Sequence, residues 1–150
     1  MGLKKEALVQ YLIAQLQEKI VAAQEAIAST KAARDSDTKS SAGDKHEVGR
    51  EMVQRELDAQ EAQLAKTVIL VHVLKDLPLD HELGCVDLGS LVVTDMGTYF
   101  ISIGIGQVEF DGQNVFVISL ASPIGQLLNG KKSEETISFN GKEIKILEVD

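Results

Sequence analysis

Apolar residues recur at every third or fourth position through the first half of the chain, and this spacing predicts two helices. The first series is Leu8, Leu12, Leu16, Ile20, Ala23 and Ile27. The second series is Val53, Leu57, Leu64, Val68 and Val71, with Gln60 where another apolar residue would fall. Such spacing places the apolar side chains along one stripe of a helix. No proline occurs from residue 3 to residue 77, and strong helix formers dominate this stretch.

The segment between the two series has no apolar periodicity. It runs from Arg34 to Asp44 and is rich in Asp, Ser and Thr, which cap helices or compete for backbone hydrogen bonds. A turn here makes the helices antiparallel, so that each buries its stripe against the other. Residues 1–77 are therefore expected to form a helical hairpin, a coiled-coil arm on the order of 45 Å long, with an acidic tip near residues 35–47.

After Pro78 the pattern changes to short β-branched runs separated by glycine-containing turns. The predicted strands are residues 91–94, 98–103, 115–119, 137–139 and 143–149. Asn140-Gly141 is a strong hairpin signal, and Gly104-Ile105-Gly106 is interpreted as a bend or bulge between strands. Ser122 and Pro123 suit the cap and first turn of a short helix over residues 122–128. Residues 78–150 are therefore expected to form a small antiparallel β domain with one short helix, which makes the fold class α+β.

The charge of the chain argues against nucleic-acid binding. With 15 basic and 23 acidic residues, the net charge is −8, so the chain lacks the basic face that sequence-specific or general binding to nucleic acid requires. Residues 1–76 hold 11 basic and 12 acidic side chains, whereas residues 77–150 hold 4 and 11. The second half is the acidic one, and a basic surface on a partner protein would suit it.

The only cysteine, Cys85, cannot form an internal disulfide, and a cytoplasmic location is expected. No stretch approaches the roughly 20 apolar residues needed to span a bilayer. No membrane association is therefore expected, and the oligomeric state stays open.

Two carboxylates near the tip are candidate metal ligands. Asp44 and Glu47 lie three residues apart at the start of the second helix, where they would project to nearly the same side. Helix capping and the helix dipole explain them as well as a functional role does. The functional interpretation is an exposed pair that holds Mg²⁺, which takes one or two carboxylates and keeps its waters. A partner would have to supply the other ligands, and Asp35 and Asp37 add acidic groups across the turn.

The second half carries the most specific motif of the chain. Residues 118–132 read Ile-Ser-Leu-Ala-Ser-Pro-Ile-Gly-Gln-Leu-Leu-Asn-Gly-Lys-Lys. This segment resembles the Ile-Ser…Ser-Pro-Ile…Leu-x-Gly-Lys signature of the Gre transcript-cleavage factors, which lies in their FKBP-like C-terminal domain. Gly89-Ser90-Leu91-Val92 is similar to the Gly-Ser-x-Val start of that domain. The architecture resembles the family along the whole chain, whereas the motifs are confined mostly to the second half.

The resemblance implies a transcription elongation factor that binds RNA polymerase. In the family the FKBP-like domain grips the rim of the secondary channel, and the helical arm passes down the channel. The tip carboxylates then share Mg²⁺ with the polymerase, which hydrolyses backtracked RNA. Such a factor stimulates the polymerase and is not an enzyme by itself. On this chain the polymerase-docking residues would be Ser122, Pro123, Ile124, Gly130 and Lys131.

The tip matches the first part of the family pattern, which is Gly-Asp-x-x-Glu followed by Asn-Ala-Glu-Tyr. Gly43-Asp44-Lys45-His46-Glu47 would make Asp44 and Glu47 the catalytic pair and, together with Asp37, the ligands of the shared Mg²⁺. A second register places Asp44 on the family's Glu and Ser41 on its Asp. Val48-Gly49-Arg50-Glu51 departs from the family in both registers, so stimulation of cleavage is left open, whereas polymerase docking is expected.

Other functions fit parts of the sequence. The helices could form a non-catalytic coiled-coil interaction or dimerisation module, or a competitor that occupies the channel without promoting cleavage. An FKBP-like fold also suggests a prolyl isomerase, whose pocket stacks proline on several aromatic rings. The second half offers only Tyr99, Phe100, Phe110, Phe116 and Phe139 for such a pocket.

Overall fold

The fold is α+β, as predicted: two long helices are followed by a six-stranded mixed sheet with one short helix. The computed structural model describes residues 4–37, 44–80 and 84–150, without the side chains of residues 37 and 44–48. Within these ranges, no helix combines the length and the apolar content needed to cross a membrane.

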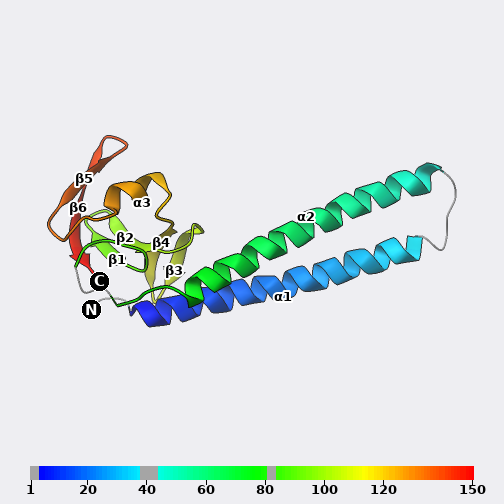
Figure 1. Cartoon of the computed structure of the whole chain (residues 1–150), viewed down its shortest axis with the longest axis horizontal. Coiled ribbons are helices and arrows are strands. Elements are labelled where there is room, and N and C mark those ends of the chain that lie inside the picture. The colour runs from blue at the N-terminus through cyan, green and yellow to red at the C-terminus, as the bar shows by residue number, and fades with distance from the viewer. Residues whose placement is uncertain (1–3, 38–43, 81–83) are drawn as a thin grey trace. The chain divides into compact units, whose positions relative to one another are not determined.

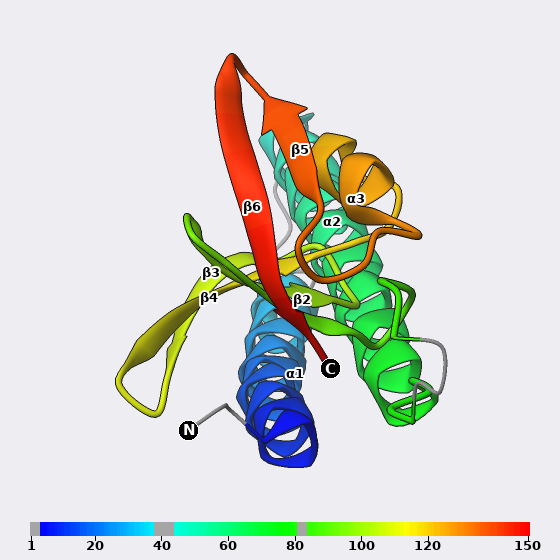
Figure 2. The ribbon, with the colours of Figure 1, turned by 90° about the vertical axis from the view of Figure 1, so that its left-hand side faces the viewer.

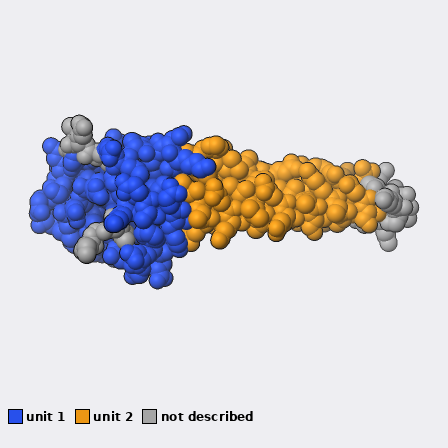
Figure 3. Space-filling model, turned by 90° about the horizontal axis from the view of Figure 1, so that it is seen from below, with its two compact units in different colours: residues 1–12, 73–150 blue, residues 13–72 orange. Residues whose placement is uncertain are grey.

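The chain forms two compact units, which Figure 3 colours separately. Unit 1 comprises residues 1–12 and 73–150, and unit 2 comprises residues 13–72. The unit that holds the sheet therefore also contains the first turns of α1 (Lys5–Asp37) and the last residues of α2 (Asp44–Lys75).

Unit 2 is an antiparallel pair formed by the remaining parts of α1 and α2, which run side by side in Figure 1. Lys31 Nζ on α1 lies 3.6 Å from Glu61 Oε1 on α2, and Arg34 Nη1 donates to Gln54 Oε1 over 3.3 Å. A later residue on α1 thus meets an earlier residue on α2, which is the antiparallel order that the turn near residues 34–44 predicts. The buried apolar side chains of unit 2 are Ile13, Leu16, Ile27, Leu57 and Val71.

Gln60 interrupts the apolar seam of unit 2, as its place in the second series predicts. Its side-chain carbonyl oxygen is buried and has no hydrogen-bond partner among the described residues. An unsatisfied buried polar atom costs about 1–3 kcal/mol of stability. The seam is therefore weaker here than at its fully apolar positions.

We expect Gln60→Leu to raise the free energy of unfolding by about 1–2 kcal/mol, because it removes the unsatisfied carbonyl and extends the apolar seam. Urea denaturation followed by circular dichroism measures the change. Gln63→Leu on the exposed side of α2 is the control, with no expected gain. Equal stability of the Gln60 variant and wild type would contradict an energetic cost at this position.

Unit 1 is built on a single mixed sheet, shown from one end in Figure 2. The strand order across it is β3-β4-β2-β1-β6-β5. The strands are β1 (Leu91–Thr94), β2 (Gly97–Ile101), β3 (Gly106–Phe110), β4 (Gln113–Ile118), β5 (Thr136–Phe139) and β6 (Lys142–Val149). The short helix α3 (Pro123–Leu128) lies between β4 and β5 in the sequence. Five of the six strands and the helix fall where the sequence predicts them.

The prediction of a purely antiparallel sheet is wrong at the centre, because β2 and β4 pair in parallel. After β2 the chain turns at Gly104-Ile105-Gly106 and places β3, which was not predicted, two strand positions from β2, so that one strand fits between them. The tight turn at Asp111-Gly112 then returns β4 into the space between β3 and β2. A chain that reverses direction twice before it pairs with β2 must run parallel to it.

Both faces of the central strands are buried. On the face toward α3, Val92, Tyr99 and Ile101 pack with Ile124 and Leu128 of the helix. The opposite face presents Leu91, Phe100, Val115 and Val117, all of them buried. Alternating residues of a strand point to opposite faces, so these strands need cover on both sides.

The helical ends in unit 1 cover the second face of the sheet. Leu8, Leu12 and Leu74 on these ends are fully or almost fully buried. The ring of Tyr11 on α1 lies 5.0 Å from the ring of Phe110 on β3. The first turns of α1 therefore belong to the core of the β unit.

Lys5 ties the start of α1 to the end of the chain within unit 1. The residue is only 4% exposed, its Nζ donates to the Leu79 carbonyl, and it lies 3.8 Å from Asp150 Oδ1. A buried lysine of this kind contributes both through its aliphatic stem and through charge-assisted hydrogen bonding.

We expect Lys5→Ala to lower the free energy of unfolding by about 2 kcal/mol, because both contributions are lost. Lys4→Ala removes the same charge from the exposed neighbouring position and should change stability by less than about 0.5 kcal/mol. Thermal denaturation of the two variants side by side measures both changes in stability. A general charge effect would lower the stability of both variants equally, whereas a local contact would lower only that of Lys5→Ala.

Candidate functional site

The motif at residues 118–132 folds into a capped helix that is anchored at its start. Ser122 has extended backbone angles (φ −66°, ψ 155°) and is the N-cap of α3, with Pro123 in the first turn. The Gly125 N–H donates to Ser122 Oγ over 3.0 Å, and the Ser122 hydroxyl donates to the Ser119 carbonyl over 2.7 Å. One side chain thus satisfies a free backbone N–H of the helix and joins the helix to the end of β4.

Gly125 allows α3 to lie this close to the preceding chain. A Cβ at this position would come within 2.1 Å of the Ser119 carbonyl oxygen and 2.8 Å of Ser122 Oγ. Neither atom can move away without breaking the cap, because the two atoms are hydrogen-bonded to each other. The glycine is therefore required by packing.

The end of α3 is fixed to the loop before the sheet. The Asn129 N–H donates to the Gly125 carbonyl over 3.0 Å, and Gly130 follows in a left-handed conformation with φ +80°. The Gly130 N–H donates to the Val86 carbonyl, and the Val86 N–H donates to the Lys131 carbonyl, both over 2.8 Å. Left-handed backbone after a helix favours glycine. The Gly-Lys part of the motif therefore connects the helix to residue 86.

The five predicted docking residues have different environments. Ile124 is 9% exposed and packs in the core, and the hydroxyl of Ser122 is occupied by the cap. Pro123 and Gly130 are exposed, and Lys131 is half-buried. Ile124 therefore supports the site from inside, and any partner would touch Pro123, Gly130 and Lys131.

Leu127 is an exposed residue of this site that the sequence reasoning missed. It lies on α3 with 38% of its surface exposed, whereas Leu128 beside it is fully buried. The sequence carries the signal, since adjacent leucines on a one-turn helix cannot both face the sheet. Leu127 thus adds an apolar group near Pro123.

We expect Gly125→Ala to destabilise unit 1 by about 2 kcal/mol or more, because the methyl group displaces α3 from Ser119. The matched control is Gly104→Ala, whose backbone is not left-handed and whose Cβ would meet nothing closer than 3.9 Å. Thermal unfolding of both variants tests the difference. A Gly125 variant as stable as the Gly104 variant would contradict the close contact.

The predicted catalytic and metal-ligating side chains lie outside the described part of the structure. Asp37 is the last residue of α1 and Asp44 the first residue of α2, and Glu47 follows in the first turn of α2. The side chains of these three residues are not described, so their approach to one another is untested. The nearby Asp35 is exposed, and its Oδ1 lies 3.3 Å from Arg34 Nε. Elsewhere in the described ranges, no group of three or more His, Cys, Asp or Glu side chains is placed to hold a metal ion.

The aromatic rings of the second half are used for packing. Tyr99 and Phe116 stack with ring centroids 5.2 Å apart, and Phe100 is fully buried. Burial raises the pKa of the Tyr99 hydroxyl above its ordinary value. Phe110 contacts Tyr11, and Phe139 packs against the core. These rings therefore contribute to the packing of unit 1.

Comparisons of the chain with protein-family models, with curated proteins and with solved structures found no match. What the protein does is therefore inferred from its own residues and geometry.

Proposed function

We propose that the protein is a Gre-like transcription elongation factor or regulator that binds the secondary channel of RNA polymerase. One combination supports this function best: a long antiparallel helix pair with carboxylates at its turn, and a β unit that carries the Ser-Pro-Ile…Gly-Lys motif on a capped helix. The motif and the helix pair come from different halves of the chain, so they support the proposal independently.

The helix lengths fit an arm that reaches into a channel. α1 has 33 residues and α2 has 32, which corresponds to about 48 Å at the usual rise per residue. The seam that joins them in unit 2 occupies one stripe of each helix. Asp44 and Glu47 lie in the first turn of α2, whereas the residues of α2 that belong to unit 1 are its last ones.

The β unit suits docking on a basic rim. In this proposal its mixed sheet with one short helix is an FKBP-like domain, and Pro123, Leu127 and Lys131 form the docking surface beside Ser122 and Gly130. Residues 77–150 hold 4 basic and 11 acidic side chains, so the net charge of this half of the chain as a whole would draw it toward a positively charged partner.

In the proposed mechanism the tip carboxylates bind and orient, and the polymerase performs the hydrolysis. Mg²⁺ shared with polymerase carboxylates would help to activate water and to stabilise charge on the phosphate. Asp44 and Glu47, with Asp37 across the turn, would supply oxygen ligands of the type that Mg²⁺ prefers. The alternative is a non-catalytic competitor that occupies the channel. The departure from the family pattern at Val48-Gly49-Arg50-Glu51 is consistent with this alternative.

The test is cleavage of backtracked RNA by RNA polymerase from the organism that encodes the protein. Wild-type protein should accelerate cleavage, and Asp44→Ala/Glu47→Ala should reduce the acceleration by roughly tenfold or more, because the pair orients the metal and its water. Glu51→Ala/Glu56→Ala removes the same charge from exposed positions further along α2 and should leave the acceleration unchanged.

Other outcomes separate the alternatives. Polymerase binding and displacement of an authentic cleavage factor, without acceleration, would identify the competitor. The absence of both binding and acceleration would contradict the polymerase function altogether. A dimer in sedimentation would then favour the coiled-coil module.

A further inference from the structure

The outer edge of β3 carries backbone hydrogen-bonding groups that no other described strand uses. β3 is the first strand in the order β3-β4-β2-β1-β6-β5, so it pairs with β4 on one side only. A two-residue turn, Asp111-Gly112 with φ +53° and +74°, joins the two strands and places Phe110 opposite Gln113. Figure 2 shows β3 and β4 projecting from one side of the sheet as a hairpin.

The register with β4 determines which groups of β3 are free. Bonded and non-bonded pairs alternate along an antiparallel ladder, and the residues that flank a two-residue turn form a bonded pair. Phe110 and Val108 therefore exchange hydrogen bonds with β4. The N–H and C=O groups of Gln107 and Glu109 point to the outer edge, where no strand of the described chain lies beside them.

The two faces beside this edge differ in chemistry. Val108 and Phe110 share one face of β3, and the ring of Tyr11 lies 5.0 Å from that of Phe110. These three side chains are half-buried, so part of their apolar surface is open to solvent. Gln107 and Glu109 share the opposite face and are exposed. Among the described residues, none forms an ion pair with the Glu109 carboxylate.

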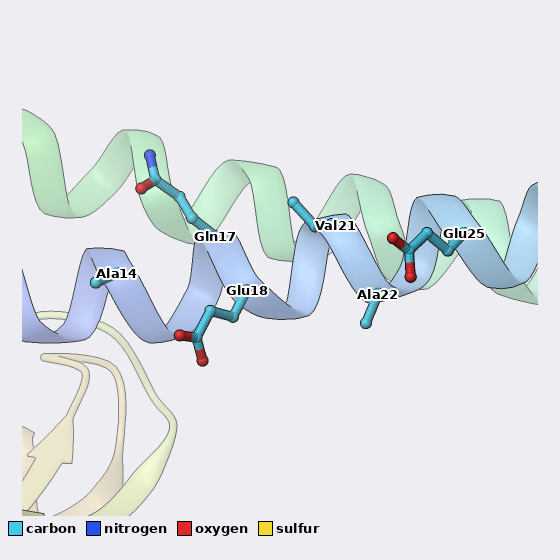
Figure 4. Close-up of a pocket in the computed structure, with 6 residues that line it drawn as sticks. All are labelled: Ala14, Gln17, Glu18, Val21, Ala22 and Glu25. Atoms are coloured by element: carbon cyan, nitrogen blue, oxygen red, sulfur yellow. The ribbon is translucent and has the colours of Figure 1, made fainter.

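The exposed face of α1 in Figure 4 has no comparable backbone groups. It is lined by Ala14, Gln17, Glu18, Val21, Ala22 and Glu25. These residues lie inside a continuous helix, whose backbone N–H and C=O groups are bonded to one another. A partner could bind only side chains there, whereas on β3 it can also form main-chain hydrogen bonds.

We propose that the outer edge of β3 binds an extended segment of a partner protein in which basic and apolar residues alternate. The segment lies antiparallel to β3 and exchanges main-chain hydrogen bonds with Gln107 and Glu109. Directly opposed residues of such a pair share a face. A lysine or arginine opposite Glu109 therefore meets its carboxylate, and the next residue of the segment lies on the face of Val108 and Phe110.

Charge complementarity favours this segment over a second copy of the chain. Glu109 and Asp111 are exposed, and the hairpin from Gly106 to Gln113 contains no basic residue. Two copies paired through β3 would bring these like charges together, which is unfavourable between paired strands. An acidic side chain at the edge is one of the means by which sheets avoid pairing with themselves. A basic strand removes this obstacle.

Fluorescence anisotropy with the full-length protein tests the proposal. The probe is a short labelled peptide of alternating lysine and valine with blocked ends. The same peptide with N-methylated lysine amides should bind at least about tenfold more weakly, because it keeps its charge and loses its main-chain donors. A peptide with glutamate in place of lysine should also bind at least about tenfold more weakly.

Glu109→Lys tests the charged contact from the side of the protein. It should weaken binding of the lysine-valine peptide at least about fivefold, because attraction between opposed residues becomes repulsion. Glu143→Lys makes the same charge change at an exposed position of β6 and should stay within about twofold of wild type. Unchanged circular dichroism of both variants excludes loss of fold.

Amide hydrogen exchange locates the bound peptide. In the free protein the N–H groups of Gln107 and Glu109 should exchange rapidly, because they face solvent. The peptide should slow both at least about tenfold, whereas Val108 and Phe110, which are already bonded to β4, should change little.

The remaining outcomes overturn the proposal. If the N-methylated peptide binds equally well, or if Gln107 and Glu109 gain no protection, general attraction to the acidic chain explains the binding. If the free protein sediments as a dimer with both amides already protected, a second copy occupies the edge. None of these results bears on the polymerase function, which has its own test.

Discussion

The close approach of α3 to the end of β4 determines the arrangement of the candidate docking surface. Gly125 lies so near the Ser119 carbonyl that a Cβ would be 2.1 Å from it. This approach lets Ser122 join the Gly125 N–H to the Ser119 carbonyl and sends Leu128 into the core. Once Leu128 is buried, the exposed side of this one-turn helix carries Leu127. Which residues are exposed on α3 therefore depends on the backbone contact at the buried Gly125.

The central strands of unit 1 need helices on both faces because their apolar side chains are buried on both sides. Strands at the centre of the sheet are apolar on both sides, as is typical of sheets that are covered on both faces. α3 packs on one face through Ile124 and Leu128, and the buried ends of α1 and α2 supply Leu8 and Leu74 for the other. The β unit thus requires residues from the start of the chain and from the end of α2. Unit 1 therefore extends across Pro78 to the last residues of α2 and also includes the first turns of α1.

Local patterns predict the elements of this protein better than their pairing. The three- and four-residue spacing identifies α1 and α2, and Asn140-Gly141 identifies the β5–β6 hairpin, because each signal is contained in a few neighbouring residues. β3 escaped prediction because only Val108 and Phe110 face inward on a short edge strand. Its position between two reversals, which makes β4 parallel to β2, depends on contacts across the sheet that no local pattern encodes. The same limit applies to the site. The sequence predicts Ser122 and Pro123 as the start of a helix, whereas the burial of Ile124 depends on the packing of α3 against the sheet.

The two halves of the chain differ in net charge, and this difference affects the electrostatic attraction of a partner to each half. Residues 77–150 carry 4 basic and 11 acidic side chains, whereas residues 1–76 carry 11 and 12 and are almost neutral. The field of the second half acts over roughly a Debye length, about 8 Å at physiological salt, and favours the first encounter with a basic surface. Residues 1–76 lack such a net field, because their acidic and basic side chains nearly balance. In the proposed function the second half would therefore steer the first encounter with a basic partner, whereas the helix pair would act only through contacts made at short range.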